Sequence, residues 1–373
     1  MKRLGLIVNP IAGMGGKVGL KGTDGPEILE RAIRLGATPV AQQRTVEALQ
    51  TLRTRFTSSI ELLTCSQKMG EESAKEIGFG PNVVYRTPIQ QTTPNDTRQA
   101  AKLLQARRVD LLLFVGGDGT ARDICDAIDS NIPCLGIPAG VKIYSSVFST
   151  NPRSGGDLAA RYLDGNAGLM DGEVLDVDES ELRTDRITVR LHGHLRVPFD
   201  HMKLHNFKAG SILDDDEANA QDAIARFVEE QLRDDWTYII GPGSTTAALG
   251  RRLGFEKTIL GVDAIRGRTA IGKDLSEQGI VRLLIHGRTS IIVTPIGGQG
   301  FIFGRGNPQI SAGIIKRVGK ENIIVVATKH KIHSLKTKRL LVDTGDPELD
   351  EELSGYIKTI TGYREYSVLP VSA

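Results

Sequence analysis

Short apolar runs alternate with helical segments over the first half of the chain. Runs of the kind expected for strands buried on both faces lie at 4–8, 59–64, 109–115 and 132–137. Helices are expected at 26–35, 45–53, 70–77, 94–107 and 120–128. Because strands separated by helices form βαβ units, we expect an α/β domain built on a doubly wound parallel sheet.

The pattern changes near residue 171. Antiparallel strands are expected at 173–177, 186–191 and 194–199, followed by a helix that begins in the acidic run 214–217 and ends near 233. Further along, strands are expected at 236–240, 290–294 and 322–328, with a helix at 245–253. We therefore expect a second, β-rich mixed α/β domain, with residues 1–168 in the first domain and 169–373 in the second. The C-terminal tail could pack back on the first domain.

The stretch FVGGDGTARDI (114–124) joins one predicted strand to the next helix. Glycines let a backbone approach a ligand without a Cβ in the way, and a helix N-terminus suits phosphate oxygens. In open parallel sheets, ligands bind beyond the carboxyl ends of the strands. The pattern predicts a phosphate-binding turn, and the alternative is a tight turn in which Asp118 caps the helix.

A second glycine-rich turn, NPIAGMGGKVG (9–19), follows the first predicted strand. It departs from the P-loop pattern because Val18 follows Lys17, and from the dinucleotide fingerprint because Val18 stands where the third glycine belongs. Both turns would lie at carboxyl ends of strands in one sheet, so they could face a shared crevice.

These motifs make the chain recognisable. The pair NPxAGxGG and GGDGT resembles the superfamily of NAD kinases, diacylglycerol kinases and sphingosine kinases, and GPGSTTAALG (241–250) resembles the TGSTAY-type segment of NAD kinases. CLGIPAGVK, TPIGGQGFIFGRGNPQIS and LLVDTGD resemble a long NAD-kinase-like branch that includes proteins named for acetoin catabolism. NAD kinases have a mainly β second domain, and the helices expected at 216–233 and 245–253 predict more helix here.

The resemblance implies an enzyme that phosphorylates the 2′-hydroxyl of the adenosine ribose of NAD, giving NADP, with ATP or polyphosphate as donor and with Mg²⁺. Asp118 would be the catalytic carboxylate, and the active site would lie in the interdomain cleft. The nucleotide-binding residues would be Asn9, Gly116, Gly117, Gly119, Thr120, Lys142, Gly243, Ser244, Thr245 and Thr246.

The chain also departs from NAD kinases. No aromatic residue stands near Ala247 where the TAY triplet has tyrosine, and the asparagine–carboxylate pair for the nicotinamide ribose is not found. Lys142 stands where lipid kinases carry a GTGN-type turn, so its phosphate contact is an open alternative. A kinase of a lipid or small metabolite, and a nucleotide-binding sensor without catalysis, are the other functions considered.

Two further clusters have competing interpretations. The histidine-rich stretch 192–205 could bind metal or form the polar face of a hairpin, and we favour the hairpin. Asp343 and Asp346 in LLVDTGD could hold metal or structure a turn, and both alternatives stay open. GPGSTT could equally be an ordinary helix N-cap.

The amino-acid composition and the net charge limit the kinds of binding partner that the sequence suggests. The 373 residues are 40% hydrophobic and 25% charged, and their net charge of +2 gives no argument for nucleic acid or a membrane as partner. Three cysteines without metal-ligand spacing favour a reducing cytoplasm. The apolar run after MKR is too brief for a signal peptide, so we expect none. We expect a cytoplasmic homo-oligomer whose partners are NAD and ATP.

Overall fold

A computed structural model describes most of the chain and divides it into two compact units. The described residues are 1–20, 26–87, 92–128, 132–140, 143–177, 189–199, 214–285, 287–296, 298, 300–335 and 338–373. Unit 1 comprises Met1–Met14 and Gly22–Asn206, and unit 2 comprises Gly15–Lys21 and Phe207–Ala373. The division that the structure makes near 206 therefore lies beyond the position near 168 suggested by the sequence.

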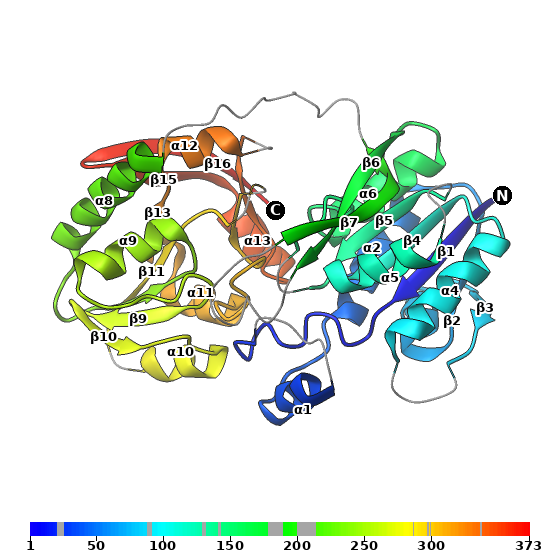
Figure 1. Ribbon diagram of the computed structural model, residues 1–373, viewed down its shortest axis with the longest axis horizontal. Helices are drawn as coiled ribbons and strands as arrows, with labels where there is room; N and C mark the ends of the chain where they lie inside the picture. The colour runs from blue at the N-terminus through cyan, green and yellow to red at the C-terminus, as the bar shows by residue number, and fades with distance from the viewer. Residues whose placement is uncertain are drawn as a thin grey trace. The chain divides into compact units, whose positions relative to one another are not determined.

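A parallel sheet forms the centre of unit 1 (Figure 1). Its strand order is β3-β2-β1-β4-β5, and all four neighbouring pairs are parallel. Every residue of β4 is buried, as expected for a strand covered on both faces. The strands are β1 (Lys2–Val8), β2 (Ile60–Cys65), β3 (Asn82–Tyr85), β4 (Leu111–Gly116) and β5 (Cys134–Pro138).

Helices cover both faces of this sheet. Contacts pair α4 with α5 and α2 with α6, as Figure 1 shows. The start of α4 is fixed as the sequence TPND suggests, because the Asp96 carboxylate accepts the backbone N–H of Thr93 at 2.7 Å. These layers confirm the predicted α/β class. The helices are α1 (Pro26–Arg34), α2 (Ala41–Arg55), α3 (Glu71–Glu76), α4 (Pro94–Ala106), α5 (Asp118–Ala127) and α6 (Pro152–Leu163), with a 3₁₀ turn η1 (Gln67–Met69).

An antiparallel hairpin completes unit 1. Its strands, β6 (Gly168–Val177) and β7 (Val189–Phe199), pair with each other and contact α5, β5 and α6. The sequence predicted three strands here. In the structure, one strand, β7, runs through both of the last two predicted segments.

Unit 2 is built on a nine-stranded mixed sheet with the order β10-β9-β8-β11-β13-β15-β16-β14-β12. Strands β8, β11, β13 and β15 are parallel, whereas β9 pairs antiparallel with β8, and β16 with β15. The C-terminal residues form β16, inside this sheet. The strands are β8 (Thr237–Ile240), β9 (Asp263–Arg266), β10 (Thr269–Gly272), β11 (Thr289–Val293), β12 (Phe301–Phe303), β13 (Ile323–Val326), β14 (Leu340–Val342), β15 (Gly355–Gly362) and β16 (Glu365–Ser372).

Successive side chains along the strands of this sheet point to opposite faces and pack into two apolar cores. Ile240 and Ile292 pack in a core with residues of α8 and α9, whereas Ile239 and Ile291 pack in a core with residues of α11 and α13. The helical segments expected from the sequence are present as α8 and α9, which confirms the mixed α/β character. The helices are α8 (Asp214–Gln231), α9 (Ser244–Arg252), α10 (Glu277–Leu283), α11 (Ala312–Val318), α12 (Lys329–Ser334) and α13 (Pro347–Leu353), with a 3₁₀ turn η3 (Lys320–Asn322).

Among the described residues, no helix combines the length and the apolar character needed to cross a bilayer.

Candidate active site

The two glycine-rich turns of unit 1 meet at one edge of its sheet. They follow β1 and β4, which are parallel neighbours, so their carboxyl ends lie side by side. The Asn9 backbone N–H donates to the carbonyl of Val115 at 2.9 Å, and the Asn9 amide donates to the Thr120 hydroxyl at 3.0 Å. The predicted shared edge is therefore present, and it brings Asn9 to the first turn of α5.

Backbone packs against backbone where β4 and β5 end. A Cβ added at Gly140 would lie 2.9 Å from the Gly117 Cα, and one added at Gly116 would lie 2.3 Å from the Thr120 hydroxyl oxygen. The Gly116 carbonyl accepts the backbone N–H groups of Ala139 and Gly140. Glycine is needed at these positions for close approach, and this holds the start of α5 against the end of β5.

Asp118 begins α5, and its carboxylate is oriented by the backbone of a neighbouring loop. One carboxylate oxygen accepts the N–H of Tyr144 at 2.8 Å, and the other accepts the N–H of Ser145 at 2.9 Å. Hydrogen bonds from backbone N–H groups to a carboxylate favour its charged form. The arrangement is a carboxylate of fixed orientation at a helix N-terminus.

Tyr144 and Ser145 were not recognised from the sequence. Tyr144 lies close enough to Asp118 to respond to its charge, and burial together with that charge raises the pKa of the Tyr144 phenol to about 12. Both residues act through the direction of their backbone N–H groups. Because almost any residue type can provide such a group, the sequence does not indicate this role. Gly119 is the second residue of α5. Lys142, the remaining residue predicted here, lies outside the described residues.

In unit 2, the loop GPGSTT follows β8 and leads into α9. Gly243 precedes the helix with φ of +128°, and a Cβ there would lie 2.4 Å from the Thr294 methyl carbon. Glycine is therefore required at this position both for its backbone conformation and for space. This loop occupies the carboxyl end of β8, beside the parallel strand β11.

The hydroxyl groups of this loop differ in how they are bonded. Thr246 donates to the carbonyls of Gly241 at 2.8 Å and Gly243 at 2.9 Å. The Ser244 hydroxyl accepts from the Gln221 amide at 3.2 Å. The Thr245 hydroxyl is buried and has no hydrogen-bond partner among the residues that the structure describes. The Thr246 hydroxyl thus stabilises the loop, whereas the Thr245 hydroxyl has hydrogen-bonding capacity that the described residues do not use.

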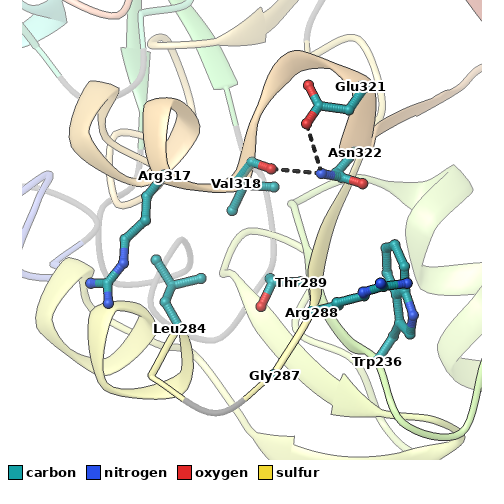
Figure 2. Close-up of a pocket in the computed structure, with 9 residues that line it drawn as sticks. All are labelled: Trp236, Leu284, Gly287, Arg288, Thr289, Arg317, Val318, Glu321 and Asn322. Atoms are coloured by element: carbon teal, nitrogen blue, oxygen red, sulfur yellow. Dashed lines mark hydrogen bonds between the residues drawn. The ribbon is translucent and has the colours of Figure 1, made fainter.

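A cavity of about 370 Å³ lies elsewhere in unit 2 (Figure 2). Trp236, Thr289 and Asn322, which line it, stand at or just before the amino ends of the parallel strands β8, β11 and β13. Arg288 lies over the Trp236 ring, 5.8 Å from its centroid. The glycine loop before α9 lies at the opposite ends of these strands, which is the side where open parallel sheets bind ligands.

Two of the residues considered as metal ligands, Asp346 and His192, have protein partners, whereas residues 200–205 of the histidine-rich stretch lie outside the described residues. Asp346 caps α13 by accepting the backbone N–H of Leu349 at 3.1 Å, and it pairs with Lys316. His192 contacts Asp126 at 2.7 Å. No group of three or more His, Cys, Asp or Glu side chains capable of holding a metal occurs in the part of the chain that the structure describes.

Fold and glycine loops together define a two-domain phosphotransferase of the nucleotide-binding kinase class. The ATP-NAD kinase N-terminal domain matches residues 4–167, and the ATP-NAD kinase C-terminal domain matches residues 233–371. The chain belongs to the ATP-NAD kinase family. This confirms the resemblance that the motifs indicated, and NAD kinase is the function that this membership supports.

Two solved structures described as diacylglycerol kinases from Bacillus anthracis strain Sterne are similar to parts of the chain. One is 16% identical with a TM-score of 0.23, and covers 48% of this chain and 46% of its own. The other is 14% identical with a TM-score of 0.24, and covers 64% and 57% respectively. The chain thus spans about half the length of these two proteins. Comparison with curated proteins gives no match.

Proposed function

We propose that the protein transfers the γ-phosphoryl group of ATP to the 2′-hydroxyl of the adenosine ribose of NAD, giving NADP and ADP. The observation that carries this proposal is the Asp118 carboxylate, held by two backbone N–H groups at the N-terminus of α5. A base that is already oriented costs no reorganisation during the reaction, and phosphoryl transfer depends mainly on such positioning. Membership of the ATP-NAD kinase family supports the choice of substrates.

In the proposed step, the ribose 2′-oxygen forms a bond to the γ-phosphorus while the bond from that phosphorus to the β–γ bridging oxygen breaks. The hydroxyl proton passes to the Asp118 carboxylate, and ADP leaves with the electrons of the broken bond. The backbone of Gly117 and Gly119 and the Asn9–Thr120 pair would support the phosphates at the start of α5. General-base catalysis contributes about 10²- to 10⁴-fold to the rate.

Mg²⁺ would neutralise phosphate charge during this step. Ions of this kind are usually held by one or two carboxylates together with substrate phosphates, rather than by a protein cage. Because Asp118 is the proposed base, the ion would be held mainly by the phosphates of the donor. We propose that the ion enters with ATP or, as alternative donor, polyphosphate.

The acceptor would be bound by the glycine loop of unit 2, Gly243 to Thr246. Its support is the helix N-terminus of α9 and the buried Thr245 hydroxyl, for which the described residues provide no hydrogen-bond partner. We propose a cytoplasmic setting as well, and the three free thiols of Cys65, Cys125 and Cys134 are consistent with it.

A direct assay tests the proposal. The purified chain is incubated with NAD, Mg²⁺ and either ATP or polyphosphate, and NADP is measured with an NADP-specific dehydrogenase. We expect NADP with at least one donor and none when donor or Mg²⁺ is omitted. A folded protein that binds ATP but forms no NADP with either donor would reject the proposed reaction. Light scattering on the same sample gives the oligomeric state, for which we expect a homo-oligomer.

A further inference from the structure

A polar network connects the glycine loop of unit 2 with the start of α12. The Gln221 amide donates to the Ser244 hydroxyl and to the Glu217 carboxylate, both at 3.2 Å. The same Glu217 oxygen accepts the Thr328 hydroxyl at 2.9 Å, and Thr328 caps α12. We call this group the Lys331 cluster. Its members are Glu217, Gln221, Ser244, Thr245, Thr294, Thr328 and Lys331.

Lys331 contributes a cation with little compensation. Among the described residues, its ammonium group makes one hydrogen bond, to the Thr294 hydroxyl at 3.3 Å, and no ion pair. Burial lowers the pKa of Lys331 to about 8, and the nearby Glu217 charge acts in the opposite direction. Thr294 in turn lies against Gly243, since a Cβ at Gly243 would be 2.4 Å from the Thr294 methyl. The ammonium therefore lies beside the glycine loop.

The cluster also contains acceptors that lack donors. Within the described parts of the chain, the second oxygen of Glu217 is buried and has no hydrogen-bond partner, and the same is true of the Thr245 hydroxyl. Thr245 is only 1% exposed and is the second residue of α9. A buried polar atom without a partner costs about 1–3 kcal/mol, so natural proteins contain few of them. Two such atoms, beside the buried Lys331 ammonium, indicate a site whose bonds are completed by a ligand.

The charges of the cluster select the chemistry of that ligand. A bare phosphate would meet the Glu217 carboxylate, and a cation would meet the Lys331 ammonium. A sugar hydroxyl satisfies both groups, because it donates one hydrogen bond and accepts another. Neighbouring hydroxyls of a ribose can therefore donate to Glu217 and accept from Lys331.

We propose that the Lys331 cluster is a ribose-binding subsite, in which Glu217 and Lys331 together bind sugar hydroxyls of the acceptor nucleotide. The proposal rests on the proposed function for the identity of that nucleotide. NAD kinases bind the nicotinamide ribose with an asparagine–carboxylate pair that is not found in this sequence. In the proposed subsite, Glu217 would provide a carboxylate for a ribose instead. It also explains why a buried lysine is kept where a neutral residue would be less costly.

The first test replaces Lys331 by Met, with Lys329→Met as the matched control on the same helix. Lys329 is exposed and pairs with Glu365 at 2.7 Å. Lys331→Met removes a hydrogen bond from a charged group to the ligand. We therefore expect the KM and the calorimetric Kd for NAD to rise about tenfold or more. The KM for ATP should change less than about twofold. The Tm of this variant should stay equal or rise, because an undercompensated buried charge is removed. Lys329→Met should behave as the parent.

A purely structural role for Lys331 predicts the reverse, with a lower Tm and an unchanged Kd for NAD, and that result would overturn the proposal. Glu217→Gln gives a second, isosteric test, for which we expect weaker NAD binding with the fold retained. The calorimetric arm also separates the two proposals. If the parent binds NAD but makes no NADP, the proposed reaction fails while the Kd comparison still tests the subsite.

The ribose assignment is tested with NAD analogues that each lack one ribose hydroxyl. If the cluster binds that hydroxyl, its removal weakens binding to the parent about tenfold and has little effect on Lys331→Met, so the two changes are not additive. Equal losses in parent and variant for every hydroxyl would place the cluster away from the sugars and reject the subsite.

Discussion

The glycine loop of unit 1 and the glycine loop of unit 2 look alike in sequence but differ in how their polar groups are bonded. In GGDGT, both Asp118 oxygens accept backbone N–H groups, and Thr120 is bonded to Asn9. Within the described residues, no buried side-chain N or O atom of 114–124 lacks a partner. In the second loop, the Thr245 hydroxyl has none, and the adjoining Lys331 ammonium has one neutral partner.

This difference indicates two ways of preparing a site. A group that must act on a reacting atom benefits from fixed orientation before the substrate arrives. A group that recognises a ligand can instead be left with unmet hydrogen-bonding capacity, which the correct ligand fills and a poor ligand leaves unfilled. We infer that the unit 1 loop is arranged for chemistry and the unit 2 loop for recognition.

The largest effect that the comparison predicts is at Asp118. Asp118→Asn keeps the size of the side chain but removes the proton acceptor, so we expect turnover to fall at least about 100-fold. The new amide also places a donor against one of the two loop N–H groups, so the Tm should fall as well. Steady-state assays with NAD and calorimetry with ATP measure the two effects, and the Kd for ATP should change far less than turnover.

The matched control is Asp126→Asn, which changes a carboxylate near the other end of α5. Asp126 pairs with His192 at a partly exposed site, so near-parent turnover is expected. Near-parent turnover in Asp118→Asn would instead reduce Asp118 to a tether for the loop at residues 144 and 145, and the contrast between the two loops would lose its chemical meaning.

The second effect concerns the backbone that holds the unit 1 loop. In Gly140→Ala, the added methyl would lie 2.9 Å from the Gly117 Cα, so the ends of β4 and β5 must separate. Overpacking of this kind costs about 1–3 kcal/mol. We expect a lower free energy of unfolding in urea and a roughly tenfold loss of turnover. Gly80→Ala, where a Cβ meets nothing within 4 Å, is the control and should change neither quantity.

The fold was largely predictable because its signals are local. The continuous apolar run of β4 followed by GGDGT gave strand, turn and helix in order, and the TPND capping signal gave the start of α4. The strand β3 was missed because NVVY is four residues long, lies at the edge of the sheet and is only partly buried. Four residues are too few to show the alternation of apolar and polar positions by which a strand is recognised in a sequence.

The site was predictable only where residue type carries the chemistry. Asp118 and Gly243 could be proposed from the sequence because a carboxylate and a glycine are residue types with a chemical or conformational meaning of their own. Tyr144 acts through its backbone N–H, which any residue other than proline provides. Lys331 was missed because its significance comes from burial beside a loop that is 85 positions away in sequence, and no spacing encodes that contact.

The third effect separates the two threonines of the second loop. Thr246→Val removes the hydroxyl bonds to Gly241 and Gly243, so we expect a loss of about 1–2 kcal/mol in the free energy of unfolding. Thr245→Val replaces a hydroxyl without a partner, so stability should be kept or raised while the KM for NAD rises several-fold. Urea denaturation and steady-state kinetics on both variants test this. Equal behaviour of the two would mean that the loop is a plain helix cap.

The smallest effect is a dependence of stability on pH that comes from Lys331. Burial lowers its pKa from 10.5 to about 8 in the folded chain, so between these values the unfolded chain binds more protons than the folded one. Stability must then rise with pH across this window, because the penalty for the buried charge is full below about pH 8 and is lost by about 10.5.

Urea denaturation at pH 7, 8, 9 and 10 measures this pH dependence as the difference in the free energy of unfolding between the parent and Lys331→Met. The titrations that both chains share cancel in this difference. We expect the parent to gain on the order of 1 kcal/mol relative to Lys331→Met over this range. A difference that stays constant with pH would mean that the ammonium is well compensated in the folded chain, and the unit 2 loop would then be as fully bonded as the loop of unit 1.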